Sequence, residues 1–310
     1  MDIKAKKIFV GLSGGVDSAV SAALLKNAGA TVTGVFIKGW YPSDMPCAWA
    51  AERRDAMRVA ARLHIPFLTL DAGAEYKKSV IDYLLAEYRA GRTPNPDVMC
   101  NREVKFGAFY RFARERGADA IATGHYRSGE KDQSYFLWAV PKDILETTIF
   151  PVGKMEKSEV RALARRFNLP VAEKKDSQGV CFLGSISVEE FLKRECGAEN
   201  PALLYTIGQR VPRPEGPWYV VGKNVEKGTI AVSKTRTTER RKISFTDANW
   251  FNEPSGSLIA QYRYRGPRIR GTVERNRFVS SEPLFEVYAP GQSIVFYKGG
   301  ELVGGATMTA

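Results

Sequence analysis

The chain has 310 residues, of which 44% are hydrophobic and 26% charged, as in a globular protein of about two domains. Its 46 Lys and Arg against 34 Asp and Glu give a net charge of +12, which favours a polyanionic partner and disfavours an acidic macromolecular ligand. The excess is uneven, because residues 201–310 hold 16 basic and 9 acidic side chains, a net charge of +7. Four cysteines are too few for a disulfide scaffold, and none stands in a Cys-x-x-Cys pair typical of structural zinc sites.

The apolar runs are short. The first of them, Ile8–Val10, is too short for the core of a signal peptide, and no run of about 18 apolar residues follows it. We therefore expect a cytoplasmic protein with reduced thiols and no membrane partner.

The first two thirds of the chain alternate between apolar β-branched runs and helical patterns. Strands are predicted at 7–12, 31–37, 66–70 and 118–123, and helices at 16–28, 48–63, 74–90, 103–116 and 156–167. Such alternation is typical of a parallel α/β sheet that binds ligands at the carboxyl ends of its strands.

The hydrophobic pattern of the sequence changes after about residue 205. Short alternating runs occur at 218–221, 229–232, 258–264, 271–274, 284–288 and 293–297, separated by Gly, Pro and Asn. This spacing predicts an antiparallel β-domain or a small barrel.

A glycine-rich loop lies between the first predicted strand and helix. Its residues are Gly11, Leu12, Ser13, Gly14, Gly15, Val16, Asp17 and Ser18. Small residues there let backbone N–H groups approach a phosphate at a helix N-terminus, and Asp17 could hold a phosphate-bound Mg²⁺. Read alone, the loop could equally be a tight turn capped by Asp17 and Ser18. The whole string SGGVDS, however, resembles the PP-loop of ATP pyrophosphatases, which cleave ATP between its α and β phosphates.

Two of the cysteines stand in unusual settings. Residues 91–101 read as a rigid two-proline loop in which Asp97 precedes Cys100 by three residues. Cys181 stands in a second glycine-containing loop preceded by Lys174 and Lys175, and nearby positive charge favours the nucleophilic thiolate. Cys100 and Cys181 are therefore candidates for reactive thiols. Cys47 and Cys196 lack such settings and are expected to be small buried hydrophobes.

A series of motifs extends over nearly the whole chain. They are SGGVDS, GRTPNPDVMCN, ATGHY, KDQSYFL, FPVG, KKDSQGVCFLG, YTIGQR and PWYVVGK, in that order. In these motifs the chain resembles the MnmA family of tRNA-specific 2-thiouridylases. The resemblance implies a parallel-sheet α/β PP-loop catalytic domain at 1–185, a shortened central tRNA-binding domain at 186–241 and a C-terminal antiparallel β-barrel at 242–310.

The resemblance also implies a reaction on tRNA: thiolation of the wobble uridine, position 34, at C2. ATP, bound with Mg²⁺, adenylates the C2 oxygen, and no prosthetic group is needed. Cys181 carries the incoming sulfur as a persulfide received from a sulfur-relay protein, and Cys100 forms a disulfide with Cys181 as sulfur leaves. Asp97 acts on the base as hydrogen-bond acceptor or general base. Whether the persulfide attacks directly or hydrosulfide is first released stays open, and neither DNA nor a membrane is an expected partner.

The remaining site residues are carried over by the same motif match. Besides the PP-loop, the implied ATP-site residues are Ile37 and Gly124. The implied contacts to the target base and tRNA are Asn95, Pro96, Asp97, His125, Lys131, Asp132, Gln133, Arg263, Tyr264 and Gln292. No protein metal site is implied.

Several alternatives stay open. His125 alone would fit a structural histidine, and the basic-aromatic string 262–270 fits either a solvated strand face or a phosphate-binding stripe. The stretches 127–130, 185–204 and 211–216 depart from the family pattern; these departures concern contacts to the tRNA body and the size of the central domain, and the active-site motifs are intact. Two other functions compete: a PP-loop ligase or amidotransferase acting on a small molecule, and an RNA-binding protein whose PP-loop is inactive.

Overall fold

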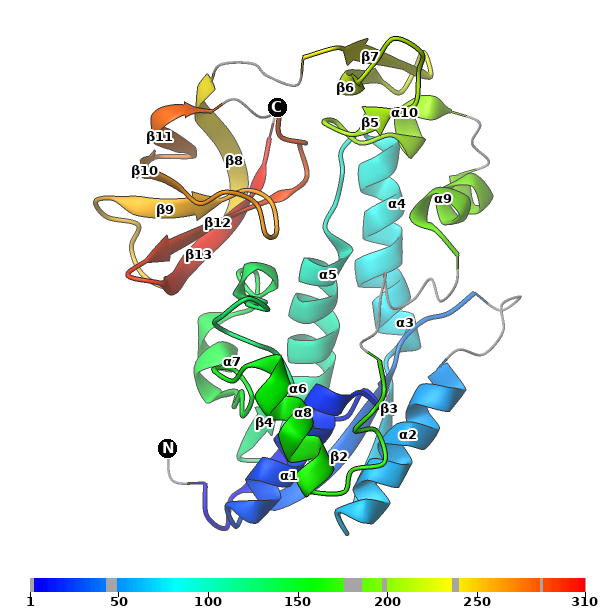
Figure 1. The fold of residues 1–310 in the computed structure, drawn as a ribbon, viewed down its shortest axis with the longest axis vertical. Coiled ribbons are helices and arrows are strands. Elements are labelled where there is room, and N and C mark those ends of the chain that lie inside the picture. The colour runs from blue at the N-terminus through cyan, green and yellow to red at the C-terminus, as the bar shows by residue number, and fades with distance from the viewer. Residues whose placement is uncertain are drawn as a thin grey trace. The chain divides into compact units, whose positions relative to one another are not determined.

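The computed structural model describes residues 3–42, 49–175, 186–196, 200–235, 240–284 and 287–309 (Figure 1). Contacts divide the chain into two units. One comprises Met1–Ser79 and Met99–Gly184, and the other comprises Val80–Val98 and Ser185–Ala310.

The first unit is built on a parallel sheet with the strand order β3–β2–β1–β4. Its strands are β1 (Lys7–Gly11), β2 (Thr31–Lys38), β3 (Phe67–Asp71) and β4 (Ala120–Ala122). The chain runs outward from β1 to β3 and then returns to the other side of β1 for β4. Loops that leave β1 and β4 therefore diverge at the carboxyl edge of the sheet, the place where open α/β sheets bind ligands.

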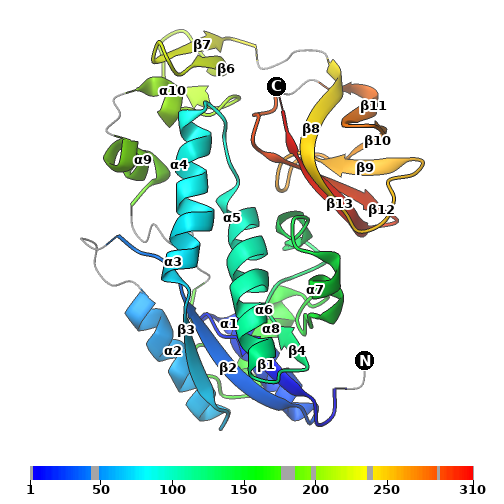
Figure 2. The same ribbon diagram turned by 180° about the vertical axis from the view of Figure 1, so that it is seen from behind.

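Helices flank this sheet. In the first unit they are α1 (Val16–Asn27), α2 (Trp49–Arg62), α3 (Gly73–Tyr76), α6 (Phe109–Glu115), α7 (Lys142–Thr147) and α8 (Lys157–Arg166), with the π-helix η2 (Cys100–Ala108) and the 3₁₀ helix η3 (Ser134–Phe136). Helix α1 contacts β1, β2 and α8, whereas α6 contacts β4 and lies on the opposite face of the sheet (Figures 1 and 2). Right-handed crossovers account for this split, because the strand order reverses direction at β1. Alanines 19, 22 and 23 of α1 are almost fully buried, so the helix packs closely on the sheet.

The second unit contains a closed barrel with the order β10–β11–β8–β13–β12–β9. Its strands are β8 (Arg240–Trp250), β9 (Leu258–Gln261), β10 (Ile269–Glu274), β11 (Arg277–Leu284), β12 (Ser293–Lys298) and β13 (Glu301–Met308), all paired antiparallel. Phe296 is fully buried in the barrel core, its ring centroid 5.7 Å from that of Phe245 and 5.9 Å from that of Phe278.

A three-stranded antiparallel sheet and short helices complete this unit. They are β5 (Arg210–Val211), β6 (Trp218–Asn224), β7 (Thr229–Ser233), the π-helix η1 (Lys77–Ile81) where the two units meet in sequence, α4 (Asp82–Arg89), α5 (Pro96–Met99), α9 (Val188–Cys196) and α10 (Pro201–Leu204). The predicted class, a parallel α/β domain followed by an antiparallel barrel, is confirmed.

Two local predictions are wrong. The proposed loop at 91–101 ends early, because helix begins at Pro96 and continues without a break through η2 and α6 to Glu115. The strand expected at 284–288 exists only at Leu284, the last residue of β11; residues 285–286 lie outside the described part, and 287–288 are not in a strand. Within the described residues, no helix is long and apolar enough to cross a membrane.

Candidate active site

The PP-loop follows β1 and opens helix α1. The Ser18 hydroxyl donates to the Gly15 carbonyl at 3.2 Å and accepts the Ser13 N–H at 3.2 Å, while the two serine hydroxyls lie 3.2 Å apart. These bonds fold the loop over the first turn of α1, where backbone N–H groups are available to an anion. Ile37, near the end of the adjacent β2, is half-buried at the same edge of the sheet.

Two glycines allow the backbone around the loop to pack closely. Gly14 has φ +76°, and a Cβ there would lie 2.3 Å from the Glu52 carbonyl oxygen. A Cβ on Gly124, which follows β4, would lie 2.7 Å from the Ser18 nitrogen. Both positions require glycine, so the predicted ATP-site residue Gly124 lies directly against the helix N-terminus of the PP-loop.

Asp17 is hydrogen-bonded to two side chains that are distant in sequence. The Lys157 ammonium donates to Asp17 Oδ1 at 2.6 Å, and the Tyr126 hydroxyl donates to the same oxygen at 2.7 Å. Lys157 is the first residue of α8, and its side chain is 15% exposed. A cation and a carboxylate thus meet at the PP-loop, and such groups are suited to binding phosphate and Mg²⁺ respectively.

Lys174 joins the PP-loop to the segment that precedes Cys181. Its ammonium donates to the Gly14 carbonyl at 3.0 Å and to the Asp55 carboxylate at 2.7 Å. Lys174 is therefore paired with Asp55, and its effect on the Cys181 thiol stays a prediction. Cys181 itself lies outside the described residues, as does Cys47.

Asp97 and Cys100 lie three residues apart in the helical run that begins at Pro96. Asn95 precedes this run, and its Oδ1 accepts the Val98 N–H at 3.4 Å, as an N-terminal cap does. Asn95, Pro96 and Asp97 are half-buried, whereas Cys100 is only 3% exposed. Cys100 opens the π-helix η2, a type of helix that occurs frequently at functional sites.

His125 is enclosed by aromatic rings. Its ring centroid lies 5.5 Å from that of Phe106 and 6.5 Å from that of Phe150, and its Nδ1 is 2.9 Å from the Thr123 hydroxyl oxygen. Loss of hydration and then the Lys105 ammonium lower the pKa of His125 to about 3. The ring is therefore neutral at pH 7, and any contact with RNA has to be a hydrogen bond or ring packing and not an ion pair.

The neighbouring residues Lys131, Asp132 and Gln133 are half-buried. Gln133 Oε1 accepts the Tyr126 N–H at 3.1 Å, and Asp132 Oδ1 accepts the Ser134 N–H at 2.9 Å. Gln133 therefore holds the backbone of Tyr126, the residue that contacts Asp17. This gives a predicted tRNA contact a structural task beside the PP-loop.

In the second unit, the basic-aromatic string lies on a turn and strand of the barrel. Four arginines are exposed there: Arg263, Arg265, Arg268 and Arg270. Tyr262 is buried in the barrel core, and Arg265 and Arg268 lie over the rings of Tyr264 and Tyr297. The arginines thus face solvent while the tyrosines anchor the segment. Gln292, the last predicted tRNA contact, instead donates to two backbone carbonyls of the chain.

Comparison with known proteins agrees with this arrangement. Residues 6–185 match the family model described as tRNA methyl transferase HUP domain, and residues 240–308 match aminomethyltransferase beta-barrel domain. The tRNA-specific 2-thiouridylase MnmA of Streptococcus thermophilus is 38% identical, over 96% of this chain and 94% of that protein. The protein of the same name in Streptococcus pyogenes is 37% identical over the same shares. The chain belongs to the MnmA family of tRNA-specific 2-thiouridylases.

Structural likeness is more distant. A solved structure described as a 4-thiouridine synthetase–RNA complex with bound ATP aligns with a TM-score of 0.39 at 24% identity, over 57% of this chain and 44% of that chain. The alignment with the Streptococcus thermophilus MnmA spans 351 positions, so this 310-residue chain is the shorter of the two.

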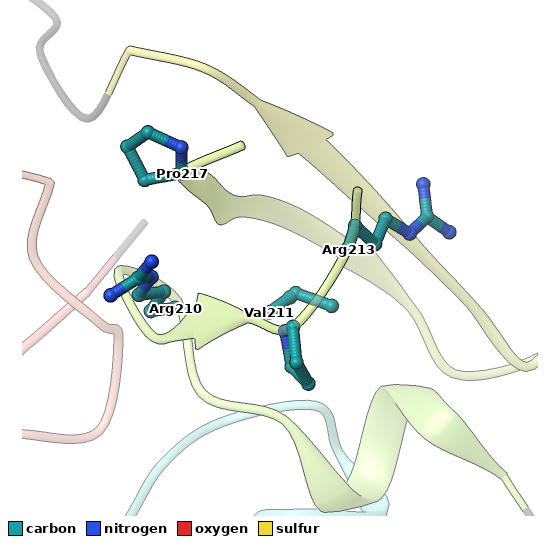
Figure 3. Close-up of a pocket in the computed structure, with 5 residues that line it drawn as sticks. Arg210, Val211, Arg213 and Pro217 are labelled. Atoms are coloured by element: carbon teal, nitrogen blue, oxygen red, sulfur yellow. The ribbon is translucent and has the colours of Figure 1, made fainter. Parts of the chain in front are cut away.

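One departure from the MnmA pattern lines a shallow pocket of about 330 Å³ in the second unit. Its walls are Arg210, Val211, Pro212, Arg213 and Pro217, and Figure 3 shows the two arginines on either side of Val211. The pocket holds none of the residues predicted for catalysis. Its arginines add to the basic surface of this unit.

Three residues at the PP-loop escaped the sequence analysis: Lys157, Tyr126 and Asp55. Lys157 and Tyr126 contact Asp17 of the loop, and Asp55 contacts Lys174, which in turn contacts the loop. These contacts join residues 140, 109 and 119 positions apart, so no local spacing marks them. The available signals were weak: Tyr126 ends the motif ATGHY, and Lys157 is the second residue of the helix predicted at 156–167.

Proposed function

We propose that this chain catalyses ATP-dependent 2-thiolation of the wobble uridine, position 34, of tRNA. The observation that supports it most directly is the bond from Lys174, seven residues before Cys181, to the Gly14 carbonyl of the PP-loop. The 38% identity to MnmA proteins over 96% of the chain supports the same substrate class.

The first step activates the base. The uridine C2 oxygen attacks the α-phosphorus of ATP, pyrophosphate leaves, and the C2–O bond now carries AMP as a leaving group. Backbone N–H groups of the PP-loop and the Lys157 ammonium bind the phosphates, and Asp17 binds the accompanying Mg²⁺. Adenylation is needed because the unmodified C2 carbonyl is a poor electrophile.

The second step transfers sulfur. A relay protein delivers a persulfide to Cys181, and the terminal sulfur becomes bonded to C2 while AMP departs with the original oxygen. The Cys100 thiolate attacks the inner sulfur of Cys181, so that two thiols are oxidised to a disulfide as the transferred sulfur is reduced. A thiol reductant then restores both cysteines. A variant order, in which Cys100 first releases hydrosulfide that attacks C2, has the same overall balance.

The third element is recognition of the base and the RNA. Asn95, Pro96 and Asp97 meet the extruded uridine, and Asp97 serves as acceptor or base toward it. Residues 1–185 carry the chemistry, while 186–241 and 242–310 bind the tRNA body through their basic side chains. We infer a cytoplasmic location, where tRNA and ATP are both available.

Pyrophosphate release distinguishes the proposed activity from that of a ligase that acts on a small molecule. The protein is mixed with ATP, Mg²⁺ and either an unmodified tRNA with uridine 34 or the same tRNA with cytidine 34. We expect release to rise only with uridine 34. Release that is indifferent to both tRNAs favours a small-molecule ligase, and failure to bind ATP at all favours a non-catalytic RNA-binding protein.

A further inference from the structure

The segment before the proposed base-binding residues is attached to the C-terminal barrel. Thr93 donates its N–H to the Pro290 carbonyl at 2.8 Å. Gln292 Nε2 donates to the Thr93 carbonyl at 2.9 Å and to the Pro94 carbonyl at 3.1 Å. All of these residues belong to the second unit, and Thr93 is only 7% exposed. Three hydrogen bonds therefore fix two consecutive residues that stand directly before Asn95.

The two backbones approach each other closely at this point. Gly291 has φ +92°, and a Cβ there would lie 2.9 Å from the Thr93 oxygen and 3.0 Å from its nitrogen. Any other residue would push Thr93 away from the barrel. Gly291 and Gln292 are themselves held, since Gly291 donates to the Met308 carbonyl at 2.9 Å and Met308 donates to the Gln292 carbonyl at 2.8 Å.

The segment is also held from its N-terminal side. The Arg92 guanidinium forms a two-pronged pair with the Glu87 carboxylate of α4, with Nε 2.7 Å from Oε2 and Nη2 bonded to Oε1. This pair raises the pKa of Arg92 and keeps its charge in place. Thr93 and Pro94 are thus fixed between α4 and the barrel.

The chemistry of the Gln292 amide limits what else it can do. A side-chain amide has two N–H donors, and here both point to carbonyl oxygens, which accept only. Because both partners are acceptors, the amide orientation is unambiguous. No amide donor is left for a phosphate or a base.

We propose that Gln292 is a positioning residue: it sets the backbone of Thr93 and Pro94 so that Asn95, Pro96 and Asp97 are presented to the target base, and it does not bind tRNA through its amide nitrogen. This rests on the proposed function for the role of Asn95–Asp97.

The test compares three variants of the full-length protein. Gln292→Met has nearly the same length but no donor, and Gln292→Lys restores a donor at similar reach. Ser280→Ala is the matched control, because it removes two hydrogen bonds of a side chain buried in the same barrel, to Glu282, away from the Thr93 segment.

Kinetics and tRNA binding are measured with uridine-34 tRNA at saturating ATP. For Gln292→Met we expect kcat to fall roughly tenfold to a hundredfold, because small misplacements of reacting groups cost about that much, with the Kd for tRNA almost unchanged. Gln292→Lys should recover most of kcat, and Ser280→Ala should keep it. A variant that loses tRNA affinity with kcat unchanged, or that loses nothing, overturns the proposal.

Hydrogen exchange of the free protein supplies a readout that does not depend on thiolation. Gln292→Met should speed exchange in a peptide covering residues 90–98, whereas Ser280→Ala should not. If the wild type forms no 2-thiouridine but this peptide responds as expected, the proposed function is wrong, whereas the positioning of the Thr93–Pro94 backbone by Gln292 is confirmed. If the wild type is active and the peptide exchanges equally in all variants, the proposal that Gln292 positions the Thr93–Pro94 backbone is wrong.

Discussion

The Lys157 ammonium lies 2.6 Å from the Asp17 carboxylate, across 140 residues of sequence. Tyr126 donates to the same carboxylate oxygen. Lys157 thereby neutralises a carboxylate that would otherwise repel phosphates. When Mg²⁺ and ATP bind, Lys157 can pair with a phosphate and Asp17 with the cation, and both of these interactions are stronger than the ion pair between the two side chains.

Replacing Lys157 by Met should therefore slow tRNA-stimulated pyrophosphate release by about a hundredfold, the usual effect of losing one charged donor at a developing negative charge. Lys154→Met is the matched control, since Lys154 is exposed three residues earlier. Equal rates for the two variants would exclude Lys157 from the nucleotide site.

The exposed arginines of the barrel predict a steep salt dependence. Binding of tRNA should weaken strongly as salt rises, while ATP affinity changes little, because only the RNA releases many counterions. Arg268→Ala should lower the slope of log K against log salt by about one. Arg165→Ala is the control, because Arg165 pairs with Glu173 in the first unit. An unchanged slope for Arg268→Ala would remove this residue from the RNA surface.

His125 predicts a pH dependence of stability. Its pKa is about 3 in the folded protein and near 6.5 when unfolded, so the unfolded state binds more protons between these values. Stability is thus lost as pH falls below 6.5, by at most about 1.4 kcal/mol per pH unit. Urea midpoints measured from pH 8 to pH 5 should fall more steeply for the wild type than for His125→Asn. Parallel curves would show that His125 is not kept neutral.

Lys223 predicts that a substitution will raise stability. Its Nζ is buried and has no hydrogen-bond partner among the described residues, and burial lowers its pKa to about 8. The cost of burying the charge is fully present below pH 8 and disappears as pH rises past the unfolded value near 10.4. Lys223→Met should therefore raise the free energy of unfolding at pH 7 by about 1–3 kcal/mol, with the gain vanishing toward pH 10. Destabilisation at pH 7 would mean that Lys223 has a favourable task.

The sequence predicted most strands and helices of the α/β unit because their apolar periodicity is strong. It missed β8, whose charged ends and exposed Asp247 interrupt the alternation of Ile243 and Phe245. It also read 91–101 as a loop, because two prolines obscured a helix that begins at the second of them, Pro96.

The candidate site likewise has one part that the sequence predicted and another that it did not. The PP-loop is a continuous stretch of sequence, so its residues alone predicted it. The contact of Lys157 with Asp17 and the bond from Gln292 to Thr93 instead depend on packing between segments 140 and 199 residues apart. Spacing in the sequence carries no information about such contacts. Only the fold brings them together.

The central claim is that Cys181 carries the sulfur that reaches C2 of uridine 34. Unmodified tRNA is incubated with ATP, Mg²⁺ and a cysteine desulfurase supplied with cysteine as the persulfide source, and its nucleosides are measured by mass spectrometry. We predict 2-thiouridine with the wild type and with Cys196→Ser, and none with Cys181→Ser, although that variant still binds tRNA. Retained 2-thiouridine with Cys181→Ser would contradict the account.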